Sequence, residues 1–321
     1  MVYNTILEAA HDTPLVRLQR MAGPDCAEVL VKVEGLNVGG SIKTRTALRM
    51  IEAAEAEGKL NKDSVIVEPT SGNQGIGLAL VGAVKGYRTI IIMPDSVSVE
   101  RRYLVSHYGA EVRLIHDDGD IGAAIRGCMD LAKAMAAEDP HVFIPDQFSN
   151  RNNVLAQAEG TAREILRDAD GKIDGFCTGF GTGGTLTGIG HVLREANPDL
   201  RIVVAEPEHA ALLGGGSIGT HLQMGIGDGV RPAIMDFDLP DDVVLISDEE
   251  ALQAAKDLAT KEGILCGISS GTNVVAALRL AKELGPGKRV VTLLPDTGER
   301  YFSTPLFDLG GPVSTAPEGE S

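Results

Sequence analysis

Residues 174–188 read DGFCTGFGTGGTLTG, and they run from a strand-like segment into the start of a helix. The closely spaced glycines let the backbone wrap around a bound anion, and the threonine hydroxyls beside them add hydrogen-bond donors. The unpaired N–H groups at the start of a helix also favour an anion. We therefore predict a phosphate site in residues 179–188, with Thr182 and Thr185 as hydroxyl donors.

The same strand–turn–helix pattern extends in both directions along the chain. Strand-like runs are expected at residues 29–33, 64–68, 89–93, 112–115, 141–144, 174–178, 202–206, 243–247 and 290–294. Helices are expected at residues 43–57, 74–85, 98–108, 120–137, 153–168, 185–196, 248–262 and 271–284. Such alternation predicts an α/β fold with mainly parallel sheets, and helices on both faces explain the continuous apolar runs.

The strands fall into two groups, which indicates two domains with a boundary near the polar stretch 148–153. One helix has a recognisable start, because Ser247 and Glu250 are spaced as a capping box. The last dozen residues, 310–321, are rich in Gly, Pro and Ser and carry acidic residues, so a disordered tail is expected.

Composition excludes several classes of partner. The formal net charge of −16 would repel the phosphates of a nucleic acid, and the absence of Trp leaves few stacking platforms. The first residues, MVYNTILEAAHD, contain neither a basic region nor a long apolar run. We therefore expect no signal peptide, no membrane span and a cytoplasmic location.

Metal chemistry is not indicated. The four cysteines have no metal-ligand spacing, and they are interpreted as reduced thiols in or near the core. The seven histidines form no H-E-x-x-H pair, and neither G-x-S-x-G nor a Walker A sequence occurs. No metal site is expected.

Two earlier segments also place polar groups at a helix start. In residues 39–45, GGSIKTR, Lys43 lies in the first turn, where the helix dipole disfavours an ammonium and makes a neutral amine easier to reach. Residues 68–75, EPTSGNQG, combine hydroxyls, an amide and free N–H groups, which suits a carboxylate. A solvated lysine and a plain N-cap turn are the alternatives when each segment is taken alone.

One later segment, CGISSG at 266–271, places small residues and a hydroxyl where a flat ring edge could approach. Another, PDTGERY at 295–301, follows the last strand. Ordinary turns are the alternative for both. Gly179, Gly181 and Gly184 also spell G-x-G-x-x-G, and Glu206 ends the next strand, so an NAD-dependent oxidoreductase is a rival on that segment alone. That rival leaves Lys43 unexplained.

Taken together, these segments resemble one family over nearly the whole chain. They are similar, in order, to the motifs of fold-type II enzymes dependent on pyridoxal 5′-phosphate (PLP), specifically the cysteine synthase and cystathionine β-synthase group. The resemblance begins at DTPLVRL, residues 12–18, and continues through GGSIK, TSGN, Gln147-Phe148, GTGGT, GISSG and GERY. It implies a tryptophan synthase β-like fold in which each domain has a mainly parallel sheet flanked by helices.

The resemblance also implies a domain division and a homodimer. Residues 1–37 and 151–309 would form the larger, PLP-binding domain. Residues 38–150 would form the smaller domain, which carries the Schiff-base lysine and the substrate loop.

The resemblance assigns roles to individual residues. Lys43 would hold PLP as a Schiff base and then act as the base at the substrate α-carbon. Asn73 would bond the ring hydroxyl, and Ser269 would meet the pyridine nitrogen. The phosphate would be held by Gly181, Thr182, Gly183, Gly184 and Thr185. The substrate carboxylate would be bound by Thr70, Ser71, Gly72 and Gln74, with Gln147 close by.

The implied reaction is replacement of the β-substituent of an activated serine, O-acetylserine or O-phosphoserine, by sulfide or a thiol through an aminoacrylate. Serine at the ring nitrogen makes a weaker electron sink than aspartate, which favours prompt loss of the β-leaving group. Related alternatives are a cystathionine β-synthase, a 2,3-diaminopropionate-type synthase with an amine nucleophile, and a cysteine β-lyase. A non-catalytic cofactor-binding regulator is an alternative of a different class.

The chain departs from the family pattern at several positions. Val38 replaces a proline, Thr44 an aspartate and Gln74 the last threonine of T-S-G-N-T, while residues 149–153 read SNRNN where the family usually begins E-N-P-A-N-P. The G-I-G-A-G-F-x-P stretch reads GIGDGVRP at residues 225–232. Arg151 and Arg231 are candidates to bind an anionic leaving group such as phosphate, or a second carboxylate on the nucleophile, and surface arginines are the alternative. Asp228 instead favours a cationic partner. These departures leave the leaving group and the nucleophile open.

Overall fold

The computed structural model describes residues 2–216 and 219–307. The predicted tail therefore lies outside the described residues. Ten strands are present in these ranges: β1 (Leu15–Arg17), β2 (Glu28–Val33), β3 (Val65–Pro69), β4 (Arg88–Pro94), β5 (Glu111–Ile115), β6 (Val142–Phe143), β7 (Gly175–Gly179), β8 (Arg201–Pro207), β9 (Asp242–Ile246) and β10 (Arg289–Leu294).

Nine α-helices are described: α1 (Lys43–Ala56), α2 (Asn73–Lys85), α3 (Val99–His107), α4 (Ile121–Glu138), α5 (Asn152–Ala156), α6 (Ala162–Asp168), α7 (Gly184–Ala196), α8 (Asp248–Asp257) and α9 (Ile268–Leu284). A π-helical turn at Gln157–Thr161 joins α5 to α6, and another at Leu258–Glu262 extends α8. The predicted capping box is confirmed, because the Ser247 hydroxyl accepts the N–H of Glu250 and the Glu250 carboxylate accepts the N–H of Ser247.

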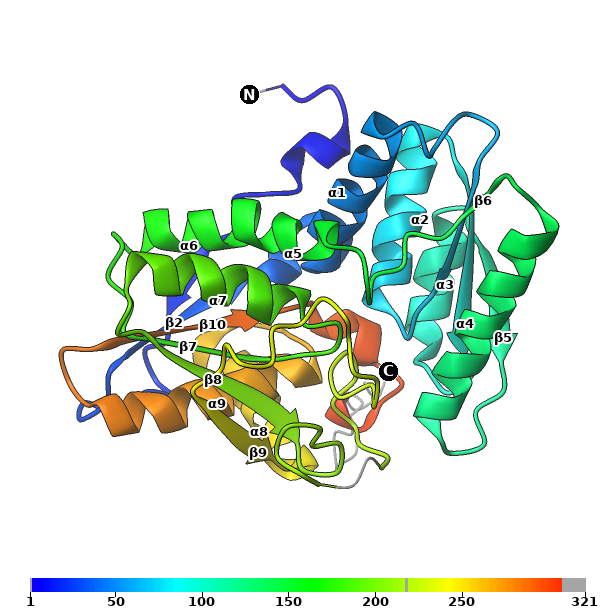
Figure 1. Ribbon diagram of the computed structural model, residues 1–321. Helices are drawn as coiled ribbons and strands as arrows, with labels where there is room; N and C mark the ends of the chain where they lie inside the picture. The colour runs from blue at the N-terminus through cyan, green and yellow to red at the C-terminus, as the bar shows by residue number, and fades with distance from the viewer. Residues whose placement is uncertain (1, 217–218, 308–321) are drawn as a thin grey trace, which may run out of the picture.

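Two sheets organise the chain (Figure 1). The larger has the order β1-β2-β10-β7-β8-β9, and every pair is parallel except β1 with β2. The smaller has the order β5-β4-β3-β6 and is entirely parallel. The chain starts in the larger sheet, builds the smaller one between residues 65 and 143, and then returns to the larger.

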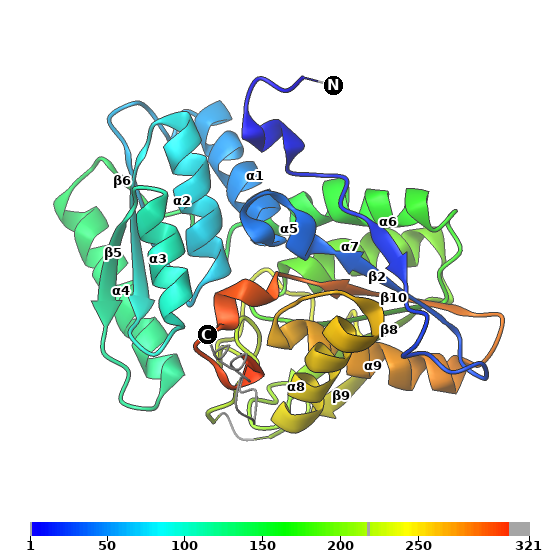
Figure 2. The same ribbon diagram turned by 180° about the vertical axis from the view of Figure 1, so that it is seen from behind.

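Helices cover both faces of each sheet, as the apolar strands predict (Figure 2). In β2, Val29, Val31 and Val33 belong to a core with α8 and α9, whereas Leu30 faces a second core with α6 and α7. This period of two is expected for a strand whose successive side chains point to opposite faces. The smaller sheet is packed in the same way, with α1, α2 and α3 on one face and α4 on the other.

The α/β fold class with parallel-dominated sheets is therefore confirmed. We propose that the two sheets are the cores of the two domains predicted at residues 1–37 with 151–309 and at residues 38–150. No helix among the described residues combines the length and the apolar character that a membrane crossing needs.

Candidate active site

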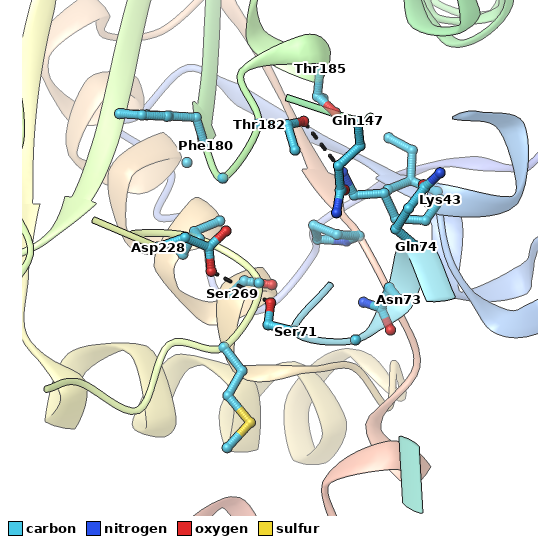
Figure 3. Close-up of a pocket in the computed structure, with 18 of the residues that line it drawn as sticks. Lys43, Ser71, Asn73, Gln74, Gln147, Phe180, Thr182, Thr185, Asp228 and Ser269 are labelled. Atoms are coloured by element: carbon cyan, nitrogen blue, oxygen red, sulfur yellow. Dashed lines mark hydrogen bonds between the residues drawn. The ribbon is translucent and has the colours of Figure 1, made fainter. Parts of the chain in front are cut away.

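One cavity lies beyond the carboxyl ends of β3, β7 and β10, where ligands commonly bind in parallel α/β sheets (Figure 3). It brings together segments that are far apart in the sequence. The predicted site residues that line it are Lys43, Thr70, Ser71, Gly72, Asn73, Gln74, Gln147, Gly181, Thr182, Gly183, Thr185 and Ser269.

Lys43 is the first residue of α1 and reaches across the cavity. Its Nζ lies 3.5 Å from Oγ1 of Thr182. Helix α1 packs on the smaller sheet, so it brings Lys43 to the glycine-rich segment that follows β7 of the larger sheet. Burial lowers the pKa of Lys43 to about 8, against the opposing effects of Asp228 and Glu68. The sequence predicted a lowered pKa from the helix dipole, whereas the larger cause in the structure is desolvation.

The glycine loop, residues 181–185, leads from β7 into α7. Among the described residues, no backbone carbonyl accepts the N–H groups of Gly181, Thr182 or Gly183. A Cβ on Gly183 would lie 2.4 Å from Cβ of Met235, and Gly183 has a φ of +78°, so both space and conformation require glycine. The loop is therefore tightly backed and presents free donors to the cavity.

Asn153 supports this loop and was not predicted from the sequence. Its Nδ2 donates to Oγ1 of Thr182 at 2.9 Å and to the carbonyl of Gln147 at 2.8 Å. A Cβ on Gly184 would lie 2.3 Å from Oδ1 of Asn153, which explains why Gly184 lies behind the cavity lining. The only sequence signal was the polar run at residues 149–153.

The Thr70 loop, residues 70–74, connects β3 to α2. Oγ1 of Thr70 accepts the N–H of Gly72 at 3.1 Å, which shapes the turn. Gln74 is 1% exposed, and its Nε2 meets only the sulfur of Met50, at 3.8 Å. Its Oε1 has no hydrogen-bond partner among the described residues. A buried acceptor without a partner costs about 1–3 kcal/mol, so a ligand donor would stabilise this loop.

Asn73 is held by the segment at residues 295–301. Its Nδ2 donates to Asp296 at 2.7 Å, and its Oδ1 accepts from Arg300 at 2.6 Å. A carboxamide has a second N–H and a second lone pair, so one donor and one acceptor remain for a ligand. The PDTGERY segment therefore acts on the cavity through Asn73.

Gln147 is positioned by Glu68, which the sequence analysis did not single out. The carboxylate of Glu68 accepts the backbone N–H groups of Asp146 and Gln147, both at 3.0 Å. Burial raises the pKa of Glu68 to about 8. No local motif identifies this role, because the partners are 78 and 79 residues apart.

Arg101 lies beneath the Thr70 loop and is also new. It is 1% exposed, and it donates to Tyr301 at 2.9 Å and to the carbonyl of Ser71 at 3.4 Å. A Cβ on Gly72 would lie 2.8 Å from the Arg101 side chain, which leaves room only for glycine. A permanent positive charge thus supports the loop from behind.

Arg231 and Arg151 are not brought to the cavity. Both side chains are exposed, and Arg231 stacks on the ring of Phe237 at 3.5 Å from its centroid. Asp228, by contrast, does line the cavity, with Oδ1 at 3.5 Å from the Ser71 hydroxyl. The predicted substrate contact at Arg231 has no support from this geometry.

Glu206 does not support the dinucleotide alternative. Its carboxylate is buried and accepts the backbone N–H groups of Leu212, Leu213 and Gly214, with shortest distances of 2.8, 3.0 and 2.8 Å. A carboxylate used in this way holds a local turn. Among the described residues no group of His, Cys, Asp and Glu is arranged to hold a metal ion.

The cavity fits PLP. The glycine loop offers unpaired N–H groups at the N-terminus of a 13-residue helix, which suits a phosphate. Lys43 stands beside that loop as an amine that is easily made neutral. Ser269, in the first turn of α9, is 4% exposed and places a neutral hydroxyl on the same cavity.

The chain belongs to the pyridoxal-phosphate-dependent enzyme family, whose model matches residues 6–296. It is 44% identical over 305 residues to a cysteine synthase of Staphylococcus aureus, covering 95% of this chain and 97% of the relative. The crystal structure of O-ureido-L-serine synthase is 43% identical with a TM-score of 0.93 and covers 98% of both chains.

A hydrogen sulfide-producing enzyme from Fusobacterium nucleatum is 42% identical with a TM-score of 0.89, covering 94% of this chain and all of the other. The predicted family, enzyme class and cofactor are thus confirmed. The chain is a PLP-dependent enzyme of the cysteine synthase type, and the predicted chemistry, β-replacement on a small serine derivative, is supported.

Proposed function

We propose that this enzyme replaces the leaving group of an activated serine, O-acetylserine or O-phosphoserine, with sulfide or a thiol. The observation that carries the proposal is the meeting of Lys43, the glycine loop, the Thr70 loop and Ser269 around one cavity. The S. aureus relative named cysteine synthase supports the same reaction.

The cofactor would be held at four points. Lys43 would bind it covalently, the N–H and hydroxyl groups of Gly181, Thr182, Gly183, Gly184 and Thr185 would bind its phosphate, and Ser269 would face the ring nitrogen. Asn73 would donate its remaining N–H to the ring hydroxyl. When bound, PLP supplies an electron-withdrawing ring that makes the α-proton of an attached amino acid acidic.

The protein groups would then orient the substrate and move the proton. Thr70, Ser71, Gly72 and Gln74 would bind the α-carboxylate, with Gln147 beside it and the charge of Arg101 behind it. Lys43 would take the α-proton. An amine with a pKa of about 8 is roughly 10% neutral at pH 7, against roughly 0.03% for an ordinary lysine.

Two relatives favour neighbouring activities on the same scaffold. One is named a hydrogen sulfide-producing enzyme and another an O-ureido-L-serine synthase, so the leaving group and nucleophile differ between close homologues. For this chain the departures at Gln74 and Asp228 fall on the substrate side of the cavity. Cysteine β-lyase activity is therefore the second candidate.

The test is product identification by mass spectrometry. The PLP-loaded enzyme is incubated with O-acetylserine, O-phosphoserine, serine or cysteine, each with sulfide or with 2-mercaptoethanol. The proposal expects cysteine or its thioether from an activated serine. Cysteine is also incubated without a nucleophile. Release of sulfide from it, with no product from an activated serine, would replace the proposal with the lyase activity. No product from any donor would reject both activities.

We also propose a cytoplasmic location and, as the family resemblance implies, a homodimer. Light scattering on the purified enzyme measures its mass directly. A mass near twice the 33.7 kDa of one chain is expected, and a monomer would contradict it.

A further inference from the structure

Asp228 stands between the two loops of the cavity. Its Oδ1 lies 3.5 Å from the hydroxyl of Ser71 in the Thr70 loop (Figure 3). On the other side, a Cβ added to Gly181 would lie 3.0 Å from its Oδ2, so the second oxygen contacts the glycine loop. Glycines with positive φ at positions 225, 227 and 229 wind the chain around it. The carboxylate is therefore presented to the cavity by a shaped segment.

This position is unfavourable for a purely structural carboxylate. Both neighbouring loops suit anions, and a fixed negative charge beside them opposes anion binding. Among the described residues, Asp228 forms no salt bridge, and its one side-chain hydrogen bond is the long contact with Ser71. A side chain that contradicts its surroundings without a compensating partner marks a functional position.

The basic side chains facing Asp228 are those of Lys43, Arg101 and His221, and Nδ1 of His221 accepts the N–H of Gln223 at 3.1 Å. Burial raises the pKa of the Asp228 carboxyl, and the nearby basic groups, Lys43 first, oppose that shift. Arg101 is committed to Tyr301 and Ser71, and Lys43 lies near Thr182. The acceptor capacity of the carboxylate therefore remains available to a ligand in the cavity.

We propose that Asp228 makes this enzyme prefer a neutral nucleophile that carries a proton on its attacking atom, and that the carboxylate accepts this proton. The inference rests on the proposed β-replacement and specifies its second substrate. The class comprises un-ionised thiols and amines, whereas hydrosulfide, as an anion, is disfavoured by the same charge.

The proposed step forms one bond at the β-carbon and transfers two protons. The lone pair of the attacking sulfur or nitrogen forms the bond to the unsaturated β-carbon left when the leaving group departs, while its proton passes to Asp228. The electron pair of the carbon–carbon double bond moves to the α-carbon, which takes a proton from the ammonium of Lys43. Asp228 then returns its proton to solvent.

The experiment compares the wild-type PLP-loaded enzyme with Asp228→Asn and Asp228→Ala. O-Acetylserine is added first, and the second step is then timed with hydrosulfide or with 2-mercaptoethanol near pH 8, where an ordinary thiol with a pKa of about 8.5 is mostly neutral. Asp117→Asn is the matched control, because it removes one negative charge outside the cavity lining.

We expect both Asp228 variants to lose at least tenfold with the neutral thiol, since a general base contributes about 10²–10⁴-fold. They should gain with hydrosulfide, so that the ratio of the two rate constants moves by about 100-fold. The Asp117 variant should keep the wild-type ratio. A ratio that stays within twofold in both Asp228 variants would overturn the proposal.

A binding measurement supplies a readout independent of turnover. Sulfate is titrated into the PLP-loaded protein by calorimetry, and we expect about tenfold tighter binding to Asp228→Asn than to the wild type. Equal affinities would remove the electrostatic basis of the proposal. If the wild-type enzyme does not respond to any activated serine, the proposed function fails, but the sulfate measurement still decides whether Asp228 excludes anions.

Discussion

The two loops that face each other across the cavity are built differently. The glycine loop, residues 181–185, has no room for side chains behind it and carries no charge, and the N–H groups of residues 181–183 find no partner in the part of the chain that the structure describes. Within the same described residues, the Thr70 loop has an unpartnered amide oxygen on Gln74; the buried guanidinium of Arg101 lies beneath this loop and Asp228 faces it. The glycine loop therefore suits an anion that stays bound, such as the phosphate of the cofactor. Gln74 of the Thr70 loop and Asp228 opposite it differ from the family pattern, so we expect this side of the cavity to select the substrate.

The largest loss of activity is expected at Lys43, which lies between the glycine loop and the Thr70 loop. Lys43→Ala should abolish borohydride-dependent covalent labelling by PLP and lower turnover by at least about 10³-fold, because the covalent link and the base are both lost. Labelled peptides are measured by mass spectrometry. Lys85→Ala, which removes a lysine at the end of α2 that is paired with Glu55 of α1, serves as the control and should label normally. Persistent labelling in Lys43→Ala would move the covalent site elsewhere.

The close packing behind the glycine loop can be tested by adding one methyl group at Gly183. Gly183→Ala should lower the free energy of unfolding by about 2–4 kcal/mol and weaken PLP binding, since it combines a left-handed φ with a clash on Met235. Gly58→Ala is the matched control, with a φ of +70° and open space around it, and should cost only about 1–2 kcal/mol. Urea denaturation measures both. Equal losses would show that the loop is not tightly backed.

Glu68, which lies two residues before Thr70, should make the stability of the protein depend on pH. Its folded-state pKa of about 8 is raised above the ordinary value of 4.5, so the folded protein binds the proton more tightly. Wild-type stability should therefore fall as pH rises from about 4.5 to about 8, relative to Glu68→Gln. Denaturant midpoints across that range provide the measurement. Glu138→Gln, at the exposed end of α4, should retain the wild-type profile, and identical profiles for Glu68→Gln and the wild type would refute the assignment.

The smallest effect is expected at Gln74. Gln74→Met keeps a similar volume beside Met50 and removes the unpartnered oxygen, so the free energy of unfolding should rise by about 1 kcal/mol. The KM for the activated serine should rise up to about tenfold, because the Nε2 donor proposed for the substrate carboxylate is lost together with the oxygen. Gln253→Met, on the exposed side of α8, should change neither quantity. A variant that is stabilised with an unchanged KM would remove Gln74 from substrate binding.

The sequence was most informative where function depends on neighbours along the chain. The glycine loop, the Thr70 loop and Lys43 each carry their chemistry within a few residues, so their motifs predict the anion sites and the lysine. Apolar runs located the longer strands closely. The three-residue β1 was missed, because so short an edge strand has no alternation to detect.

The sequence was least informative where function depends on distant contacts. Glu68 with Gln147, and Arg101 with Tyr301, pair across 79 and 200 residues, and neither pair leaves a local signal. The charge of Arg231 and its place in the GIGDGVRP stretch predict a substrate contact, but its side chain stacks on Phe237, six residues away, and is exposed. The charge of a residue does not say which way its side chain points.

The central claim is that both loops serve one PLP-dependent reaction on an activated serine. The most direct measurement is the visible absorption spectrum of the purified protein before and after O-acetylserine, O-phosphoserine, serine and cysteine are added separately. The account predicts a cofactor band that shifts with an activated serine and returns when a thiol is added. A cofactor band that responds to none of the four would contradict the account.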